Sequence, residues 1–309
     1  MDSPKFTIAI PAYKREYLAE ALQSCIAQSY SNFEIVIVDD ASPFNLKNVV
    51  DTFADKRILY YKNSKNIGAL NVVENWNRCL EYASGDYIIC MGDDDILCTD
   101  CLETYVELIK KYPDLSVYHA WTEIVDEKSN FRDIQSQRPE WESVYSLIWH
   151  RWECRKAQFI GDFLFDRKAL KATGGFYHLP LAWGSDDITA IIAASNKGIA
   201  NTQKVCFKYR VNSLTISNTC NTMTKCEAIR LEEDWFRIFL KNEPKDDLDK
   251  KYYILIRQML TDHFRRKMSH AIFKDMHQHH LRLWYWLKHA KRLKITKTDV
   301  FKQWIKAVS

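Results

Sequence analysis

Apolar runs of strand length alternate with apolar residues at helical spacing along the first hundred residues, and this alternation limits the fold more than any other feature. Strands that alternate with helices build a mainly parallel sheet with helices packed on its faces. We therefore expect an α/β fold of this kind. The expected strands cover residues 6–10, 34–38, 58–61 and 87–91, and the expected helices between them cover residues 18–26, 46–53 and 70–80.

Pro11 comes directly after the first of these runs. Proline has no backbone N–H and cannot donate a hydrogen bond to a strand ladder. We therefore expect the first strand to end there.

Beyond residue 100 the pattern is less regular. A charged segment with three tryptophans, residues 126–158, is interpreted as a loop or as a cover over a cleft. From Met223 onward helical spacing dominates and breaks at Pro244, which predicts a mostly helical end. The other expected elements are helices over residues 102–109, 167–172 and 185–196 and strands over residues 115–120, 161–165 and 201–211.

The net charge of +4 is divided unevenly along the chain. Residues 251–309 carry 14 Lys or Arg and 3 Asp or Glu, a net charge of +11, which leaves −7 on residues 1–250. With 309 residues, of which 47% are apolar, the chain can hold one large domain with an appendage. We expect residues 1–220 to form an acidic catalytic domain and residues 221–309 to form a basic, aromatic helical extension.

The sequence also predicts where the protein resides. No apolar run approaches the ~20 residues that a membrane-spanning helix needs. A strand pattern begins directly after Pro4, so we expect no signal peptide. The nine cysteines are an odd number without regular spacing, which is typical of reduced thiols in the cytoplasm. We therefore expect a cytoplasmic protein.

Aspartates follow two of the expected strands at the point where each strand ends. Asp39 and Asp40 follow the second strand, and Asp93, Asp94 and Asp95 follow the fourth. In open α/β sheets, ligands bind outside the carboxyl ends of the strands. Adjacent carboxylates raise each other's pKa unless a cation or hydrogen bonds hold them ionised. These aspartates predict a metal-assisted site for a phosphate-bearing ligand.

The three consecutive aspartates need not act alike. Along an extended chain, alternate side chains point to opposite sides. Asp93 and Asp95 would then face one side and Asp94 the other, so the three cannot share one function. A solvated acidic turn is the structural alternative.

Several linked motifs resemble those of a known family. The segments FTIAIPAYKR, SYSNFEIVIVDDAS, NIGALN, ASGDYIICMGDDDIL, GGF and GSDDITAII occur in the order and spacing of family 2 glycosyltransferases, which are inverting enzymes with the GT-A fold. The resemblance covers roughly residues 5–215 and leaves the C-terminal helices outside it. It implies transfer of a sugar from a nucleotide-sugar donor, with a UDP-sugar expected, to a glycan or lipid-linked acceptor in bacterial surface-polysaccharide assembly.

The resemblance assigns the aspartate run to a divalent metal ion and the donor. A cation such as Mn²⁺ or Mg²⁺ can neutralise the charge that develops on the leaving diphosphate. By position, Asp94 would hold the metal, Asp95 is a second candidate, and Asp93 would face the donor ribose. The family often has an aspartate in place of Gly92, so the roles of the three aspartates stay open.

Other donor contacts are implied near the first two strands. Asp40, with its neighbour Asp39, matches the position that hydrogen-bonds the nucleobase, and Pro11 with Tyr13 matches the lining of the base pocket. The structural alternatives are that Asp40 caps the following turn and that Tyr13 is a packed surface aromatic.

Two further segments resemble donor-binding parts of the family. Asn66 and Gly68 match a turn near the donor phosphates, although a plain tight turn explains them equally well. Arg210 could contact the diphosphate, with a structural ion pair as the equal alternative. Relatives often have a histidine where Asn212 stands in this chain.

The resemblance places the catalytic carboxylate at Asp187. An acceptor hydroxyl needs a general base, which is typically worth about 10²- to 10⁴-fold in rate. Asp186 takes the place of a family glutamate, so the two aspartates could exchange roles. Carboxylates at a helix N-terminus are also routine caps, and this is the structural alternative for both. A base opposite the leaving diphosphate would allow one in-line displacement that inverts the anomeric carbon.

The basic end of the chain predicts an attachment surface. Trp284, Trp286 and Leu287 lie among Lys and Arg side chains, a pattern typical of helices in a membrane interface. We expect peripheral contact with the inner face of the cell membrane. The alternative is packing against the catalytic domain or a second subunit in a homodimer. Nucleic-acid binding is not expected, because residues 1–250 are acidic and contain no reader motif.

Two rival functions remain open at this point. A nucleotidyltransferase could use a similar sheet and metal site, but no glycine-rich, basic triphosphate loop follows the first strand. A non-catalytic nucleotide-sugar-binding or scaffold protein could keep the same fold.

Overall fold

The computed structural model describes residues 3–153, 157–195, 197–213 and 221–308. The chain forms two compact units, and each is described by itself. The sheet unit comprises residues 1–178 and 185–215, and the helical unit comprises residues 179–184 and 216–309. The short segment 179–184, which we had placed in the catalytic domain, thus groups with the C-terminal helices.

The sheet unit is built on one large mixed sheet. Its strands, among the described residues, are β1 Phe6–Ala12, β2 Phe33–Asp39, β3 Ile58–Lys62, β4 Tyr87–Cys90, β5 Ile96–Leu97, β6 Val117–Val125, β7 Phe131–Ile134, β8 Trp141–Glu142, β9 Phe163–Asp166 and β10 Ile199–Arg210. They are ordered β3-β2-β1-β4-β9-β6-β10-β5, with β7 on β6 and β8 on β10. The strands β3, β2, β1 and β4 are parallel to one another, and β6 is parallel to β10. The expected α/β fold with a mainly parallel sheet is confirmed.

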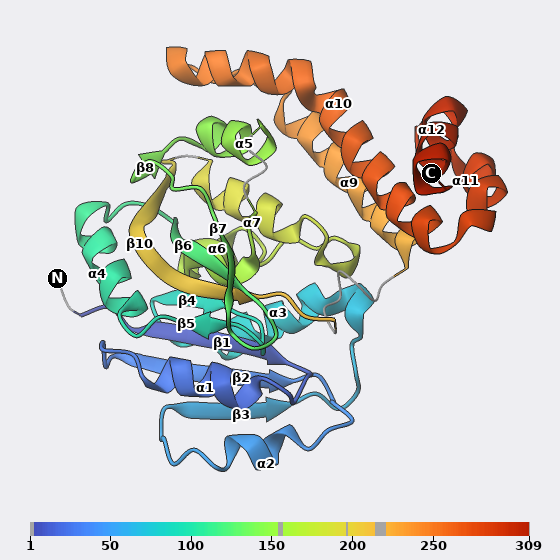
Figure 1. Ribbon diagram of the computed structural model, residues 1–309. Helices are drawn as coiled ribbons and strands as arrows, with labels where there is room; N and C mark the ends of the chain where they lie inside the picture. The colour runs from blue at the N-terminus through green and yellow to red at the C-terminus, as the bar shows by residue number, and fades with distance from the viewer. Residues whose placement is uncertain (1–2, 154–156, 196, 214–220, 309) are drawn as a thin grey trace. The chain divides into compact units, whose positions relative to one another are not determined.

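Amphipathic helices pack on this sheet, as Figure 1 shows. They are α1 Leu18–Ile26, α2 Leu46–Val50, α3 Val72–Tyr82, α4 Cys101–Lys111, α5 Val144–Glu153, α6 Arg167–Ala172 and α7 Ser185–Ala194, with short 3₁₀ turns η1 Ala69–Asn71 and η2 Ile160–Asp162. In α1 the residues Leu18, Leu22 and Cys25 are buried because their spacing puts them on one face. They join Ile8 and Ile10 of β1 in the main core.

Pro11 does not end β1, so that expectation is wrong. The strand continues to Ala12, and Pro11 is paired in register with Val38. The backbone of Ala12 bonds to β2, whereas that of Ala9 bonds to β4. Pro11 therefore has its nitrogen on the β4 side, where the β1–β4 ladder has already ended at Ala9. Its missing N–H costs no bond between β1 and β2.

Residues 126–158 are also more ordered than we expected from the sequence. They contain the strands β7 and β8 and the helix α5, rather than a loop throughout. Within α5, Leu147, Ile148 and Trp152 are buried. The two strands are only four and two residues long, which is too short for periodicity to reveal. The helix predicted over residues 185–196 ends at Ala194, and Asn196 lies outside the described residues.

In the part of the helical unit that the structure describes, two long α-helices precede two shorter ones. Its elements are η3 Pro180–Ala182, α9 Thr222–Phe239, α10 Asp247–Gln278, η4 His280–Arg282, α11 Leu283–His289 and α12 Lys297–Val308. Asn221 and Asp246 cap α9 and α10 by accepting hydrogen bonds from backbone N–H groups of the first turn. The break between these helices contains Pro244, as expected. None of the described helices combines the length and the apolar character that crossing a membrane requires.

Candidate active site

The three consecutive aspartates lie in a turn at the carboxyl end of β4, and we call residues 92–95 the aspartate turn. The strand ends at Cys90, and Asp93 and Asp94 are in turn conformation. The strand-like alternation that we expected for Asp93, Asp94 and Asp95 therefore does not hold. All three are buried, with 4–6% of their surface exposed, so the solvated acidic turn does not describe them.

Asp93 and Asp95 are held by backbone N–H groups. One oxygen of Asp93 accepts hydrogen bonds from the backbone N–H of Tyr13, at 2.7 Å, and of Lys14, at 2.6 Å. The Asp95 carboxylate accepts from the N–H of Gly92 at 3.1 Å and from that of Arg210 at 3.0 Å. These two aspartates tie the end of β4 to the loop after β1 and to the end of β10.

Asp94 differs from its neighbours because its carboxylate is bound by side chains. Its Oδ2 atom accepts a hydrogen bond from the Lys14 ammonium and another, at 2.6 Å, from the Asn212 amide. The Lys14 ammonium also lies 3.2 Å from Oδ1 of Asp93. One lysine thus bridges two adjacent carboxylates.

Burial and the close approach of these charges shift the pKa values of Asp93, Asp95 and Lys14. Burial, reinforced by the charge of Asp94, raises the pKa of Asp93 and Asp95 above the usual range. Burial by itself lowers the pKa of Lys14, but the Asp93 and Asp94 carboxylates outweigh it and hold the pKa above its usual value. Lys14 is therefore a permanent cation in this site.

Gly92 is required by the packing of the turn. A Cβ atom at this position would lie 2.8 Å from Oδ1 of Asp94 and 2.8 Å from Oδ2 of Asp95. Such contacts are closer than van der Waals separation allows. The aspartate that relatives often have at this place therefore does not fit this turn without rearrangement.

The contacts of Asp94 bear on the metal ion that we predicted there. No group of three or more His, Cys, Asp or Glu side chains in the described ranges is arranged to hold a metal ion. Divalent cations such as Mg²⁺ and Mn²⁺ prefer carboxylate oxygens, but Oδ2 of Asp94 is shared between an ammonium and an amide N–H. Asp95, the second candidate, has both oxygens on backbone N–H groups. As arranged, these residues do not fit a divalent metal ion.

Asp40 holds the turn that contains Asn66 and Gly68. Its carboxylate accepts from the backbone N–H of Ile67 at 2.8 Å and of Gly68 at 3.2 Å, and from the Asn63 amide at 2.9 Å. The Asn66 amide donates to the backbone carbonyl of Asp40 at 2.7 Å. Gly68 has φ of +82°, which favours glycine. The structure thus brings together three residues predicted to bind the donor. The contacts that Asp40 makes are those of the structural alternative, in which it caps the following turn.

Asp39 is buried, Pro11 is partly buried near the end of β1, and Tyr13 is exposed. Asp39 is fully buried, and its carboxylate accepts from the Ser42 N–H and the Tyr60 hydroxyl. Full burial leaves that carboxylate no surface for a ligand, so we no longer assign it to donor binding. The Tyr13 side chain is 44% exposed, and its role in the base pocket stays a prediction.

Arg210 is buried and its guanidinium is bound within the sheet unit. It donates to the backbone carbonyls of Asp94 and Asp126 and to the Glu20 carboxylate, and it lies over the Tyr17 ring. With 1% of its surface exposed, it offers no N–H to a diphosphate. These contacts favour the structural ion pair, so we withdraw Arg210 from donor binding. The following family-like residues 214–217 lie outside the described residues.

Asp186 and Asp187 lie in the first turn of α7 and have different surroundings. Asp187 is 5% exposed, and its Oδ1 atom accepts from Arg151 Nε at 3.0 Å and from the Gln158 amide at 2.8 Å. Oδ1 of Asp186 accepts from the backbone N–H of Asp187 at 2.9 Å, which is a cap-like contact. Acidic groups are favourable at this end of a helix. Among the described contacts, Asp186 thus accepts from a backbone N–H, whereas Asp187 accepts from side chains.

Tyr209 of β10 lies near carboxylates of both the aspartate turn and α7. Burial, followed by the charges of Asp95, Asp94 and Asp186, raises the pKa of its hydroxyl above the usual range. Charges from both places therefore act on one side chain. The Tyr209 ring stacks on Phe159, with 3.4 Å between centroids. Residues at the two ends of the predicted site thus share one neighbourhood.

Three residues of this region were missed as site residues in the sequence. Lys14 was visible as a basic residue beside Tyr13, and the uncompensated aspartate run was a signal that a cation should lie nearby. Arg151 and Gln158 gave no signal, since they come from the segment 126–158 whose helix we did not predict. Their contacts to Asp187 join residues that are 36 and 29 positions apart.

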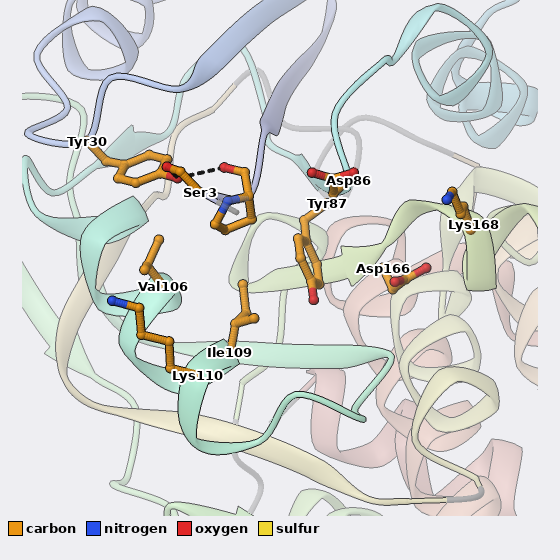
Figure 2. A pocket seen from close by; sticks show the side chains of 10 residues that line it. Ser3, Tyr30, Asp86, Tyr87, Val106, Ile109, Lys110, Asp166 and Lys168 are labelled. Atoms are coloured by element: carbon orange, nitrogen blue, oxygen red, sulfur yellow. Dashed lines mark hydrogen bonds between the residues drawn. The ribbon is translucent and has the colours of Figure 1, made fainter. Parts of the chain in front are cut away.

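A separate pocket of about 500 Å³ lies at the opposite end of the strands. Figure 2 shows Asp86 and Tyr87, at the start of β4, and Val106, Ile109 and Lys110 of α4 in its wall. Since the aspartate turn follows the other end of β4, this pocket is not the predicted donor site.

The comparisons with known proteins concern the family and the fold. The family described as "Glycosyl transferase family 2" matches residues 7–175, which is more than half of the chain. The Escherichia coli protein UDP-Glc:alpha-D-GlcNAc-diphosphoundecaprenol beta-1,3-glucosyltransferase WfgD is 31% identical over 130 residues, covering 42% of this chain and 50% of that protein. The chain spans about a fifth to a half of the length of the curated relatives that it matches.

Solved structures share the fold at low sequence identity. S. aureus TarS 1-349 in complex with UDP-GlcNAc has a TM-score of 0.63 at 16% identity, covering 98% of this chain and 79% of that chain. The Pyrobaculum calidifontis mannosyltransferase PcManGT in complex with GDP-Man and Mn²⁺ has a TM-score of 0.56 at 17% identity, covering 99% and 86%. These likenesses support the GT-A fold. The family match over residues 7–175, more than half of the chain, shows that this chain belongs to glycosyl transferase family 2.

Proposed function

We propose that the protein is an inverting glycosyltransferase that moves a sugar from a nucleotide-sugar donor to a lipid-linked or glycan acceptor in bacterial surface-polysaccharide assembly. The observation that carries the proposal is the buried Asp187 carboxylate, which Arg151 and Gln158 hold in the first turn of α7 in a chain that belongs to glycosyl transferase family 2. The name of the relative WfgD contains both a UDP-sugar and a lipid diphosphate, and a UDP-sugar is the donor we propose here.

Asp187 acts as the general base in this proposal. Its Oδ1 atom is positioned by Arg151 and Gln158, which leaves the carboxylate in one orientation. The acceptor hydroxyl transfers its proton to Asp187 as its oxygen bonds to the anomeric carbon. The bond from that carbon to the diphosphate oxygen breaks at the same time, and its electron pair leaves with the nucleoside diphosphate. One displacement of this kind inverts the anomeric centre.

Asp40 and the turn around Gly68 form the proposed base and phosphate region. The exposed Tyr13 lies in the loop that Asp93 fixes to the end of β4. A divalent cation is suggested by the family and by the Mn²⁺-bound mannosyltransferase, and Asp94 is the carboxylate that we predicted to hold it. Because the contacts of Asp94 do not fit a metal ion, no step of this mechanism depends on one.

Replacing Asp187 tests the proposal. Asp187→Asn keeps the shape of the side chain but removes the base, so we expect transfer to fall by about 10²- to 10⁴-fold. Transfer is measured as release of UDP from UDP-glucose with a synthetic GlcNAc-diphospholipid, after a thermal-shift panel of UDP- and GDP-sugars has confirmed the donor. UDP affinity should stay within about threefold of wild type, since the base does not contact the nucleotide.

Asp186→Asn is the matched control, because Asp186 makes a cap-like contact in the same helical turn. We expect it to retain most of the transfer rate. Equal loss in both variants, or unchanged turnover in Asp187→Asn, would refute the assignment of the base.

We also propose that the helical unit contacts the inner face of the membrane, where a lipid-linked acceptor would be found. Leu281 and Trp284 are 95% and 78% exposed, and Lys288 and Lys291 are exposed nearby. Trp286, which we had placed on the same surface, is fully buried and donates to Asp275 at 2.8 Å. The proposed contact surface is therefore smaller than the sequence indicated.

Vesicle flotation tests this contact. We expect binding to anionic vesicles to fall about tenfold or more in the double variant Leu281→Ser, Trp284→Ser, because each apolar side chain contributes on insertion. Ile238→Ser is the control, since Ile238 is 63% exposed on α9. If the double variant floats like wild type, packing in a homodimer becomes the better explanation for this surface.

A further inference from the structure

Lys14 occupies the place where a metal ion would be expected in the aspartate turn. Its ammonium bridges Asp94 and Asp93, and its own backbone N–H donates to Asp93. The side chain is anchored at both ends and 20% of its surface remains exposed. It is therefore fixed in position and still reaches the surface of the site.

A metal ion at Oδ2 of Asp94 would have to displace two donors. The Lys14 ammonium and the Asn212 amide both donate to Oδ2 of that carboxylate. Moving Lys14 away would break its contacts with two buried carboxylates, Asp93 and Asp94, which is unfavourable. The turn therefore favours the lysine over a divalent ion.

The ammonium has the chemistry that the reaction requires of a cation. It carries three N–H donors, of which the two carboxylates take two. A lysine acts on phosphate oxygens as a point charge. A fixed positive charge near a leaving diphosphate stabilises the negative charge that develops when the sugar bond breaks.

We propose that Lys14 is the resident cation of this site, where it binds the diphosphate of the nucleotide-sugar donor and takes the part that a divalent metal ion plays in metal-dependent transferases. This inference rests on the proposed function. The diphosphate accepts a hydrogen bond from the ammonium while Asp93 and Asp94 hold the lysine in place. Lys14 keeps its protons throughout the reaction and forms no covalent bond with the donor.

The test measures binding of UDP and Mn²⁺ to the full chain. UDP affinity is determined by calorimetry in EDTA and in Mn²⁺, and Mn²⁺ binding without nucleotide is followed by electron paramagnetic resonance. We expect wild type to bind UDP equally well in both conditions and to bind Mn²⁺ weakly. In Lys14→Met, UDP binding in EDTA should weaken by about ten- to a hundredfold, the effect of losing a charged hydrogen bond. Mn²⁺ should bind this variant more tightly and restore its UDP affinity.

Lys5→Met is the matched control. Lys5 also donates to a buried carboxylate, Glu34, but at the opposite end of β1. We expect this variant to change neither the UDP affinity nor the Mn²⁺ affinity. Should Lys14→Met fail to fold, the wild-type measurements decide alone, since they already compare UDP binding with and without Mn²⁺.

Two results would overturn the inference while leaving the proposed function intact. The first is that wild type binds UDP only when Mn²⁺ is present. The second is that Lys14→Met binds UDP in EDTA with the same affinity as wild type. If neither UDP nor GDP binds to wild type, with or without Mn²⁺, the proposed function itself is contradicted.

Discussion

The two ends of β1 each bring a lysine against buried carboxylates, but with opposite electrostatic outcomes. At the start of the strand, Lys5 donates to Glu34, which also accepts from Thr7 and Ser84. Burial by itself would raise the pKa of Glu34, but these hydrogen bonds outweigh it and lower the pKa to about 2. At the other end, Lys14 faces a crowded turn in which burial raises the pKa of Asp93 and Asp95.

This difference separates a structural cluster from a functional one. Around Glu34 the donors outnumber the carboxylates, so the charged form is stabilised and the cluster supports the fold. In the aspartate turn one ammonium contacts two of the three carboxylates, and burial together with the charge of Asp94 keeps the pKa values of Asp93 and Asp95 raised. Sites with such perturbed carboxylates are typical of functional regions. A charge cluster that stabilises the fold thus lies at one end of β1, and the crowded carboxylates of the candidate site lie at the other end.

The largest effect that would test this comparison is on stability. Glu34→Gln removes the charge that Lys5, Thr7 and Ser84 share, and we expect the free energy of unfolding to fall by about 2 to 4 kcal/mol. Asp94→Asn relieves repulsion within the turn, and we expect a change within about 1 kcal/mol. Urea unfolding at neutral pH measures both. Equal destabilisation of the two variants would break the comparison.

A smaller effect is expected when the packing of the aspartate turn is changed. In Gly92→Ala the added methyl group would press against the carboxylates of Asp94 and Asp95. Overpacking of this kind costs about 1 to 3 kcal/mol. Thermal unfolding checks the value, and UDP binding should weaken together with stability because the turn must shift. A variant as stable as wild type would show that the turn is looser than its contacts indicate.

The smallest effect is the dependence of stability on pH. The pKa of Glu34 is about 2 in the folded protein and about 4.3 in an unfolded chain. Its contribution is therefore present above the unfolded value and is lost as the pH falls toward the folded value. We expect the stability difference between wild type and Glu34→Gln to narrow by about 1 to 2 kcal/mol between about pH 5 and about pH 3. Urea unfolding across this range measures it.

The aspartate turn should respond to acid in the opposite direction. Because the pKa values of Asp93 and Asp95 are raised on folding, their protonation at low pH favours the folded protein. Asp94→Asn removes the charge that helps to raise the pKa values of Asp93 and Asp95, so this variant gains less from their protonation. It should therefore lose more stability in acid than wild type does. A parallel pH profile for the two proteins would contradict the charge crowding that we assign to the turn.

Much of the fold could be predicted because apolar residues recur at strand or helix spacing within short segments of the sequence. The runs that became β1, β2, β3 and β4 alternate with helices in the sequence as they do in the structure. Pro11 was misjudged because its effect depends on which neighbouring strand its nitrogen faces, and this is known only once the register of β1 is known. The strands β7 and β8 were missed because they are too short for a period to show.

The site was predicted in part for the same reason. Asp40, Asp94 and Asp187 could be named because they follow strand ends or begin a helix within motifs of the family. Arg210 and Asp39 could not be judged, since a charged residue in a motif looks the same whether it is buried or exposed. Only the structure shows that both are enclosed.

The sequence by itself determined the order of the first four strands and the helices between them, the family and the places where carboxylates gather, because these depend on residues close together in the chain. The tertiary structure decided what surrounds each carboxylate. Lys14 and Asp94 are 80 residues apart, and Asn212 and Asp94 are 118 apart, yet all three meet at one oxygen atom. Charge and burial act through space, so the difference between a metal ligand and a lysine-bound carboxylate exists only once the chain has folded.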